Sequence, residues 1–158
     1  MILIGLGSNI AGPWGSPRQT MARALKELNT FPLRLKQASG LIITKPFGVL
    51  NQPDFVNAVA LIETVLSPEA LMAKLHLIER AAGRRRRKRW GPRCLDLDLL
   101  DYHGLKRIGS INTLKQLRLP HPGIGMRKFV VAPLLEVAPN WRHPVNHHSA
   151  RGLLKKLR

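Results

Sequence analysis

Three aspartates lie within six residues near the middle of the chain, directly after its most basic stretch. They are Asp96, Asp98 and Asp101, in the segment CLDLDLLDY at 94–102. In an extended strand, residues i and i+2 point to the same side, so Asp96 and Asp98 are predicted to share one face and the intervening leucines the other. Such a pair of hard oxygen ligands suits Mg²⁺, which binds carboxylates together with phosphate oxygens and water. The alternative is a solvated strand face that nearby arginines neutralise.

A run of cations precedes these aspartates. Residues 84–89 read RRRRKR, and Arg80 and Arg93 flank them. Guanidinium groups stay charged and pair with phosphate through two parallel hydrogen bonds. Runs of this kind are usually solvated or bind nucleic acid nonspecifically, but here the rigid segment Trp90-Gly91-Pro92 interrupts the run. Arginines beside paired carboxylates therefore favour a site for a metal ion and a phosphate group.

The overall charge also indicates an anionic partner. The chain has 26 Lys and Arg against 9 Asp and Glu, a formal net charge of +17. Such a surface suits nucleic acid, a membrane face or a phosphate-rich ligand. No segment approaches the ~20 apolar residues of a membrane span, and the N-terminal MILIGLGSN is expected to be a strand and not a signal peptide. The lone Cys94 excludes an internal disulfide and fits a reducing cytoplasm.

Several common catalytic motifs are absent. The sequence has no GxxxxGK[ST], no G-x-S-x-G and no H-E-x-x-H, so it lacks the signatures of P-loop proteins, serine hydrolases and zincins. Gly5 and Gly7 are interpreted as small residues at a strand end that let another group approach the backbone. His143, His147 and His148 lie in a polar segment that contains proline, which argues against a metal site there.

Hydrophobic periodicity predicts the elements that carry these residues. Strands are expected at 2–7, 33–44, 55–66 and 94–102, and helices after Ser16-Pro17 and Ser67-Pro68, where a hydroxyl cap precedes proline. The order β-α-β-β-α-β is typical of the ferredoxin-like fold. A hairpin near 106–119, a helix near 129–137 and a short helix after Ser149 complete the chain. We therefore predict an α+β class, a largely antiparallel sheet with helices packed on it, as a single domain over 1–158.

Taken together, the motifs resemble one family over about residues 3–140. They are GLGSN at 5–9, TKPFG at 44–48, QPDFVN at 52–57, RWGPRCLDLD at 89–98, LPHP at 119–122 and RKF at 127–129. The chain is thereby similar to the 6-hydroxymethyl-7,8-dihydropterin pyrophosphokinases (HPPK) of folate biosynthesis. The resemblance implies transfer of the pyrophosphate of ATP to the hydroxymethyl group of 6-hydroxymethyl-7,8-dihydropterin, with release of AMP.

The resemblance also implies a set of site residues. Two Mg²⁺ ions would be held by Asp96 and Asp98, and ATP would be the co-substrate. The catalytic residues would be Arg84, Arg86, Arg93, Asp96 and Asp98. The pterin contacts would be Thr44, Phe47, Phe55, Asn57 and Phe129. The ATP contacts would be Met72, His76, Glu79, Arg84, Arg86, Trp90, Arg93, Leu99, His121 and Arg127, although the choice among the arginines of 84–89 is left open. The enzyme would be a cytoplasmic monomer that contacts no membrane and no specific nucleic acid.

Two other interpretations are compatible with parts of the sequence. A basic ferredoxin-like sheet is also typical of RNA-recognition domains, but no strand carries their aromatic motif. A family member that binds ligands without turnover would not need the intact pair Asp96 and Asp98. The spacing of Phe55 and Asn57 supports the pterin assignment on physical grounds. These residues share a strand face, so one can stack on a flat ring while the other bonds its edge.

Overall fold

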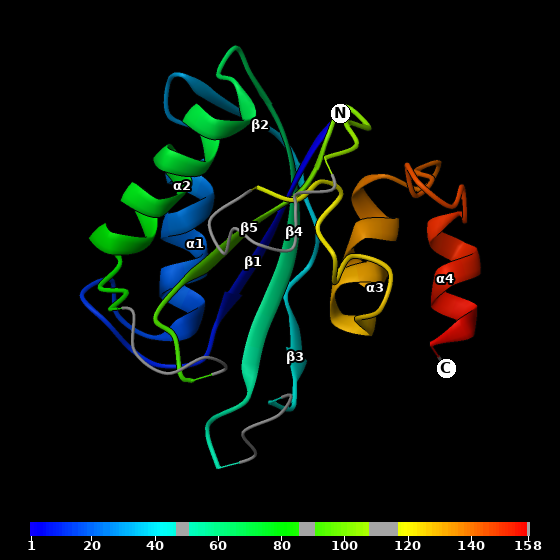
Figure 1. Cartoon of the computed structure of the whole chain (residues 1–158). Helices are drawn as coiled ribbons and strands as arrows, with labels where there is room; N and C mark the ends of the chain where they lie inside the picture. The colour runs from blue at the N-terminus through cyan, green and yellow to red at the C-terminus, as the bar shows by residue number, and fades with distance from the viewer. Residues whose placement is uncertain (47–50, 86–90, 108–116, 158) are drawn as a thin grey trace, which may run out of the picture.

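The computed structural model describes residues 1–46, 51–85, 91–107 and 117–157 (Figure 1). Within these ranges three consecutive strands separate the first two helices, and two further helices follow the last strand. The elements are β1 (Ile2–Ser8), α1 (Pro17–Glu27), β2 (Leu33–Ala38), β3 (Ile42–Thr44), β4 (Phe55–Thr64), α2 (Pro68–Ala81), β5 (Asp96–Tyr102), α3 (Lys128–Val137) and α4 (Ala150–Lys156).

The strands form one antiparallel sheet. Its order is β2-β4-β1-β5, and β3 pairs with β4 beyond the end of β2. If β2 and β3 are taken as one interrupted strand, this is the order of the predicted ferredoxin-like fold. The prediction of an antiparallel α+β fold is therefore confirmed. β1 lies at the centre, between β4 and β5, and its C-terminal half carries the two glycines.

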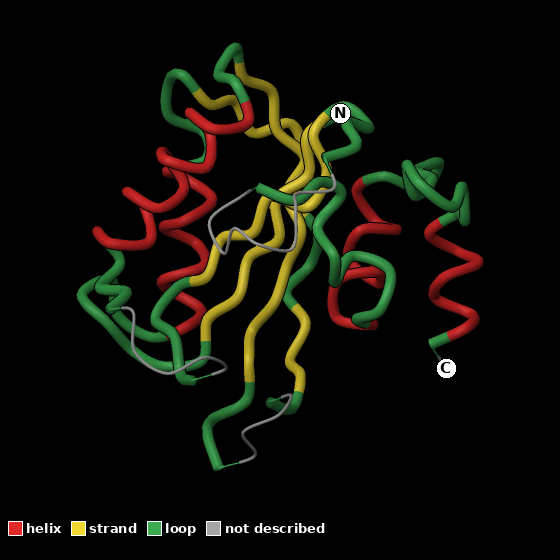
Figure 2. The backbone as a smooth tube through the Cα atoms, in the orientation of Figure 1, coloured by secondary structure: helices red, strands yellow, loops and turns green. Residues whose placement is uncertain are grey.

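Helices cover both faces of the sheet, so the molecule has three layers (Figure 2). On one face, which we call the helix-pair face, alternate residues of β1 (Ile2, Ile4 and Leu6) pack with α1 and α2 in the larger core. On the opposite face, which we call the pocket face, Leu3 packs with Val59 of β4 and with α3 and α4 in a smaller core. Period-two alternation along the strands separates the two cores.

The predicted helix starts are confirmed. Ser16 caps α1 in a capping box with Gln19, and Ser67 caps α2, with proline at the first helical position in both cases. Each serine hydroxyl accepts a hydrogen bond from a backbone N–H that has no partner inside the helix. None of the helices in the part of the chain described here is long and apolar enough to cross a membrane.

The single strand predicted at 33–44 is interrupted at 39–41. The Ser39 hydroxyl accepts a hydrogen bond from the Val59 N–H (3.0 Å), and the Gly40 N–H donates to a carboxylate oxygen of Glu136 on α3 (2.9 Å). The Ser39 backbone N–H still donates to the Val59 carbonyl (2.9 Å), but side chains accept the other two bonds, and the strand resumes at Ile42. The strand predicted at 55–66 ends two residues earlier, at Thr64.

The predicted C-terminal elements are largely confirmed. α3 and α4 lie where they were expected. Of the hairpin predicted near 106–119, the structure describes one antiparallel bridge. In it Arg107 and Leu119 exchange two backbone hydrogen bonds, of 2.7 and 3.0 Å. Residues 108–116, the rest of that hairpin, lie outside the described residues.

Candidate active site

A pocket opens on the pocket face where β1, β4 and β5 lie side by side. β1 contributes Gly5 and Gly7 to its floor. A Cβ atom on Gly7 would lie 3.1 Å from the Asn57 side-chain oxygen, and one on Gly5 would lie 3.3 Å from the Leu100 side chain. Larger residues would therefore fill the space that the pocket occupies. The interpretation of these glycines as small residues that admit another group agrees with this geometry.

One side of the pocket contains four of the five residues predicted to contact a pterin. They are Thr44, Phe55, Asn57 and Phe129; the fifth, Phe47, lies outside the described residues. The Asn57 amide donates to the Thr44 hydroxyl at 2.7 Å, and its side-chain oxygen faces Gly7. The structure thus combines two aromatic rings with an oriented amide group.

The other side of the pocket contains the paired aspartates. Asp96 and Asp98 both line it, while Leu95, Leu97 and Leu99 are buried in the core of the helix-pair face. The prediction from strand alternation is confirmed. It also means that the Leu99 side chain, predicted to contact ATP, faces away from the pocket and is 2% exposed.

Arginines neutralise the Asp96 carboxylate. Arg84 pairs with one of its oxygens at 2.6 Å, and Arg93 pairs with the other. Arg84 also contacts Glu79 of α2, whose carboxylate accepts the Leu97 N–H at 2.7 Å. Burial raises the pKa of Glu79 to about 7, although the Leu97 hydrogen bond and Arg84 oppose the shift. Of the other residues predicted for this region, Arg86 and Trp90 lie outside the described residues.

Asp98 faces His121 across the pocket edge. The His121 Nε2 atom lies 3.9 Å from an Asp98 oxygen, and His121 Nδ1 accepts the Gly123 N–H at 3.0 Å. Burial raises the pKa of Asp98, and the neighbouring Asp96 charge adds to that shift. Burial lowers the pKa of His121. The Nδ1 hydrogen bond assigns the ring proton of a neutral His121 to Nε2, the nitrogen nearer to Asp98.

The remaining predicted residues fall into two groups. Arg127 lines the pocket, with its guanidinium 5.8 Å from the centre of the Phe129 ring. Met72 and His76 lie on α2, which covers the opposite face of the sheet, and they do not line the pocket. Within the described ranges, no group of three or more His, Cys, Asp and Glu side chains could hold a metal. The acidic pair Asp96 and Asp98 remains the candidate.

Six lining residues were not predicted, and two of them, Leu6 and Ala58, directly adjoin predicted or interpreted residues on β1 and β4. Lys45 and Gly91 directly adjoin predicted residues, so sequence adjacency could have indicated them. The Lys45 ammonium group pairs with Asp54 at 3.0 Å. Leu100 and Val130 also line the pocket. Leu100 is the extra residue at an irregularity in the β1–β5 register, which no feature of the sequence indicated.

Comparison with known proteins connects this geometry to one family. The family described as 7,8-dihydro-6-hydroxymethylpterin-pyrophosphokinase (HPPK) matches residues 3–139. A protein of Pseudomonas aeruginosa named 2-amino-4-hydroxy-6-hydroxymethyldihydropteridine pyrophosphokinase is 39% identical over 93% of this chain and 86% of its own length. Proteins of the same name from Aquifex aeolicus (35% identity, 91% of this chain, 84% of its own length) and Haemophilus influenzae (41%, 85% and 79%) are similar.

Solved structures agree at the level of the fold. The HPPK-DHPS protein of Plasmodium falciparum, in a crystal structure with pteroate, superposes with a TM-score of 0.73 at 13% identity. That superposition covers 98% of this chain and 42% of the other. The family match spans nearly all the strands and helices that build the pocket. The chain therefore belongs to the 7,8-dihydro-6-hydroxymethylpterin pyrophosphokinase family.

Proposed function

We propose that the pocket on the sheet is the active site in which the chain performs its family's reaction. As a member of that family, with bacterial relatives of this name at 35–41% identity, the chain is a pyrophosphokinase of folate biosynthesis. It transfers pyrophosphate from ATP to the hydroxymethyl group of 6-hydroxymethyl-7,8-dihydropterin and releases AMP. The proposal concerns which residues do this and how.

The position of Gly7 is the observation that carries the proposal. Gly7 lies opposite Asn57 on one neighbouring strand and opposite Asp96 on the other. Adjacent strands are about 4.8 Å apart, so the backbones at Asn57 and Asp96 are about 10 Å apart, with Gly7 between them. A flat heterocycle bound beside Asn57 would direct its substituent toward Asp96. The acceptor and the phosphate-binding side of the pocket would then be neighbours.

The pterin would be held by stacking and by one oriented edge. Phe55 and Phe129 offer ring faces, and base–aromatic stacking of this kind contributes about 1–3 kcal/mol. Because one Asn57 N–H donates to Thr44, the amide is oriented, and its side-chain oxygen and its second N–H can pair with the donor and acceptor atoms of a pterin edge. Thr44 thus orients the amide for recognition.

The donor set fits Mg²⁺. Asp96 and Asp98 supply hard oxygen ligands on one strand face. Burial and the Asp96 charge raise the pKa of Asp98 although His121, Arg127 and Arg93 oppose the shift, so a bound cation would offset the repulsion between the two carboxylates. We propose that both carboxylates hold the two expected ions. Bound Mg²⁺ would neutralise phosphate charge and polarise phosphoryl oxygens.

The arginines would align the triphosphate. Arg84 and Arg93 both pair with Asp96, so each guanidinium lies where a phosphate group beside the aspartates could replace the carboxylate as its partner. Glu79 would act through Arg84, which it contacts. Transfer of this type depends mainly on alignment and charge neutralisation. No strong general base is needed, and the hydroxyl proton would pass to solvent.

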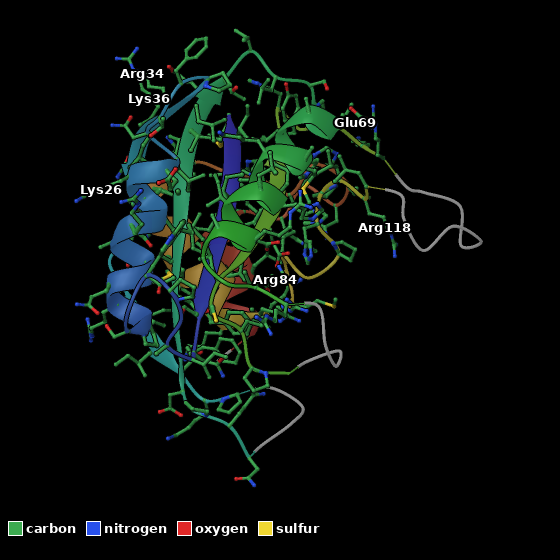
Figure 3. The ribbon with its side chains drawn as sticks, turned by 90° about the vertical axis from the view of Figure 1, so that its left-hand side faces the viewer. Lys26, Arg34, Lys36, Glu69, Arg84 and Arg118 are labelled. Atoms are coloured by element: carbon green, nitrogen blue, oxygen red, sulfur yellow. The ribbon has the colours of Figure 1, made fainter. Side chains whose placement is uncertain are left out.

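The remaining assignments are proposals of the same kind. Arg127 and His121 would contact the phosphates, and Met72, His76 and the backbone at Leu99 would lie toward the adenosine. We expect a single-domain monomer that acts in the cytoplasm, which suits the buried, free Cys94. Figure 3 shows Lys26, Arg34 and Lys36 on one side of the molecule and Arg84 and Arg118 toward the other. We expect no specific nucleic-acid site, because no strand predicted from the sequence carries the aromatic motif of RNA-recognition domains.

One experiment tests the proposal directly. The purified protein is incubated with ATP, Mg²⁺ and 6-hydroxymethyl-7,8-dihydropterin, and AMP and the pyrophosphorylated pterin are quantified together. We expect equal amounts of both products, dependence on Mg²⁺, and loss of both in Asp98→Asn. Turnover by Asp98→Asn at the wild-type rate would show that the pocket is not the active site. Glu63→Gln, at an exposed acid on β4, is the control for loss of one negative charge.

A further inference from the structure

Asn9 is a buried polar residue that does not line the pocket. It follows β1 directly, is 2% exposed, and belongs to the GLGSN motif whose glycines form the pocket floor. Buried amides are retained where their hydrogen bonds are satisfied, so the partners of Asn9 indicate what its side chain does.

The Asn9 side chain binds two separate segments. Its N–H group donates to the Gln52 side-chain oxygen and to the Pro53 carbonyl, both at 3.0 Å. Its side-chain oxygen accepts the Arg93 N–H at 2.8 Å, and the Asn9 backbone N–H donates to the Arg93 carbonyl at 3.0 Å. Three side-chain hydrogen bonds thus connect residues 52–53 with residue 93, and the side chain lies between them.

Each of these segments leads into one side of the pocket. Residues 52–53 lie one residue before Phe55, the start of β4, which also carries Asn57. Arg93 pairs with Asp96 at the start of β5. Both segments therefore use the same buried amide side chain as a hydrogen-bonding partner.

We propose that Asn9 is a positioning residue that couples pterin binding to nucleotide binding. A ligand that holds one segment in place fixes the Asn9 amide, and the fixed amide then orders the other segment at a lower entropic cost. The proposal rests on the proposed function for the identity of the two ligands. It does not require Asn9 to touch either of them.

The geometry is specific for asparagine. Aspartate would keep the acceptor for the Arg93 N–H but would place a charged oxygen against the Gln52 and Pro53 oxygens. Alanine would leave the Arg93 N–H and the Pro53 carbonyl without this partner, and an unpaired buried group is costly. Gln52→Ala removes one of the three bonds without changing the buried side chain, so it offers a milder test.

The test is a measurement of coupling, not of activity alone. Pterin affinity is measured calorimetrically with and without a nonhydrolysable ATP analogue and Mg²⁺, and the ratio of the two affinities is compared among variants. We expect a ratio well above one in the wild type, a reduction of about tenfold in Asn9→Asp, and a smaller reduction in Gln52→Ala. Asn29→Ser, at an asparagine in the distant α1–β2 turn that accepts the Leu35 N–H, is the matched control and should keep the wild-type ratio.

Each outcome decides between coupling and simple stability. If Asn9→Asp weakens the binding of both ligands but retains the ratio of pterin affinities, Asn9 has only a structural role and the proposal is overturned. A wild-type ratio of one, or an unchanged ratio in both Asn9→Asp and Gln52→Ala, overturns it as well. If Asn9→Asp does not fold, Gln52→Ala alone decides. Absence of pterin turnover in the wild type would instead contradict the proposed function.

Discussion

The two faces of the sheet are built from the same strands but differ in what fills them. On the helix-pair face, β1 presents Ile2, Ile4 and Leu6, each at most 3% exposed. On the pocket face, the same strand presents Leu3, Gly5 and Gly7. Only Leu3 packs in the smaller core. The pocket therefore occupies the space where two side chains are missing from an otherwise regular alternation.

One face of the sheet stabilises the fold, and the other leaves room for a binding site. Burial of aliphatic side chains between the sheet and the helices α1 and α2 supplies most of the hydrophobic stabilisation. Glycines within a strand stabilise it less, because they have no side chain to pack. The central strand is thus fixed from one face, and the opposite face is free to bind ligands. The variants below separate the two roles.

We expect the largest effect from the aspartates of the pocket face. Asp96→Asn or Asp98→Asn should lower turnover by about 100-fold or more, since removal of one preorganised electrostatic contact commonly costs that much. The fold should persist, because both carboxylates line the pocket. Steady-state kinetics at saturating Mg²⁺, together with thermal unfolding, measure the two effects.

Asp101 on the same strand provides the matched control. It is 3% exposed and accepts hydrogen bonds from the Trp141 indole N–H (2.6 Å) and the Gly104 N–H (2.8 Å). Asp101→Asn should cost about 1–3 kcal/mol of unfolding free energy, because one buried donor would lose its acceptor. Its turnover at low temperature should stay near the wild-type rate. Equal loss of turnover in all three variants would contradict the distinction between the aspartates.

The next largest effect is expected at Phe55. Phe55→Ala should weaken pterin binding by about 1–3 kcal/mol if the ring stacks on the pterin. ATP affinity should change little, because Phe55 lies on the side of the pocket away from the aspartates. Calorimetric titration with each ligand separately tests this. Equal losses for the two ligands would indicate that Phe55 mainly supports the pocket wall.

Glycine and isoleucine on β1 allow the faces to be compared directly. Gly7→Ala places a methyl group 3.1 Å from the Asn57 oxygen, and overpacking of this kind costs about 1–3 kcal/mol. We expect that cost to appear mainly as weaker pterin binding. Ile4→Val on the helix-pair face should instead lower stability by about 0.5–1.5 kcal/mol and leave pterin affinity unchanged. A similar pterin affinity in Gly7→Ala and Ile4→Val would contradict this difference between the two faces of the sheet.

The smallest effect is a pH dependence on the helix-pair face. Burial raises the pKa of Glu79 from 4.5 to about 7, so between these values the folded state binds more protons than the unfolded state. Stability contributed by protonated Glu79 is thus present at low pH and lost as pH rises through about 7. The free energy of unfolding, measured by denaturant titration, should therefore fall less from pH 5 to pH 8 in Glu79→Gln than in the wild type. The expected difference is about 1–2 kcal/mol. Parallel curves for both proteins would show that Glu79 does not titrate in this range.

The sequence predicted most of the fold because its signals are local. Serine–proline pairs marked the starts of α1 and α2, and alternation along 94–102 placed Asp96 and Asp98 on one face. Local signals failed at 39–41, where hydrogen bonds to residues distant in sequence interrupt the pairing of the strand. The interruption at 39–41 depends on Val59 and Glu136, and neither can be inferred from the segment LRLKQASGLIIT.

The candidate site, like the fold, could be predicted from the sequence only in part. The residue types for pterin, metal and phosphate could be named from the motifs, and the pocket contains four of the named pterin residues together with Asp96 and Asp98. Strict alternation would have placed Asp101 on the helix-pair face, but the register irregularity around Leu100 turns it toward Trp141. A register shift arises from pairing between strands, so the pattern of one strand does not reveal it.

By itself, the sequence determined which elements form and which side chains can do chemistry, because capping and alternation act over a few residues. Only the tertiary structure decided that Gly7 lies between Asn57 and Asp96, that Glu79 is buried beneath β5, and that Asn9 connects the two sides of the site. These contacts join residues tens of positions apart. They exist because antiparallel pairing brings β4 and β5 to opposite edges of β1 and so sets the distance between the amide and the carboxylates.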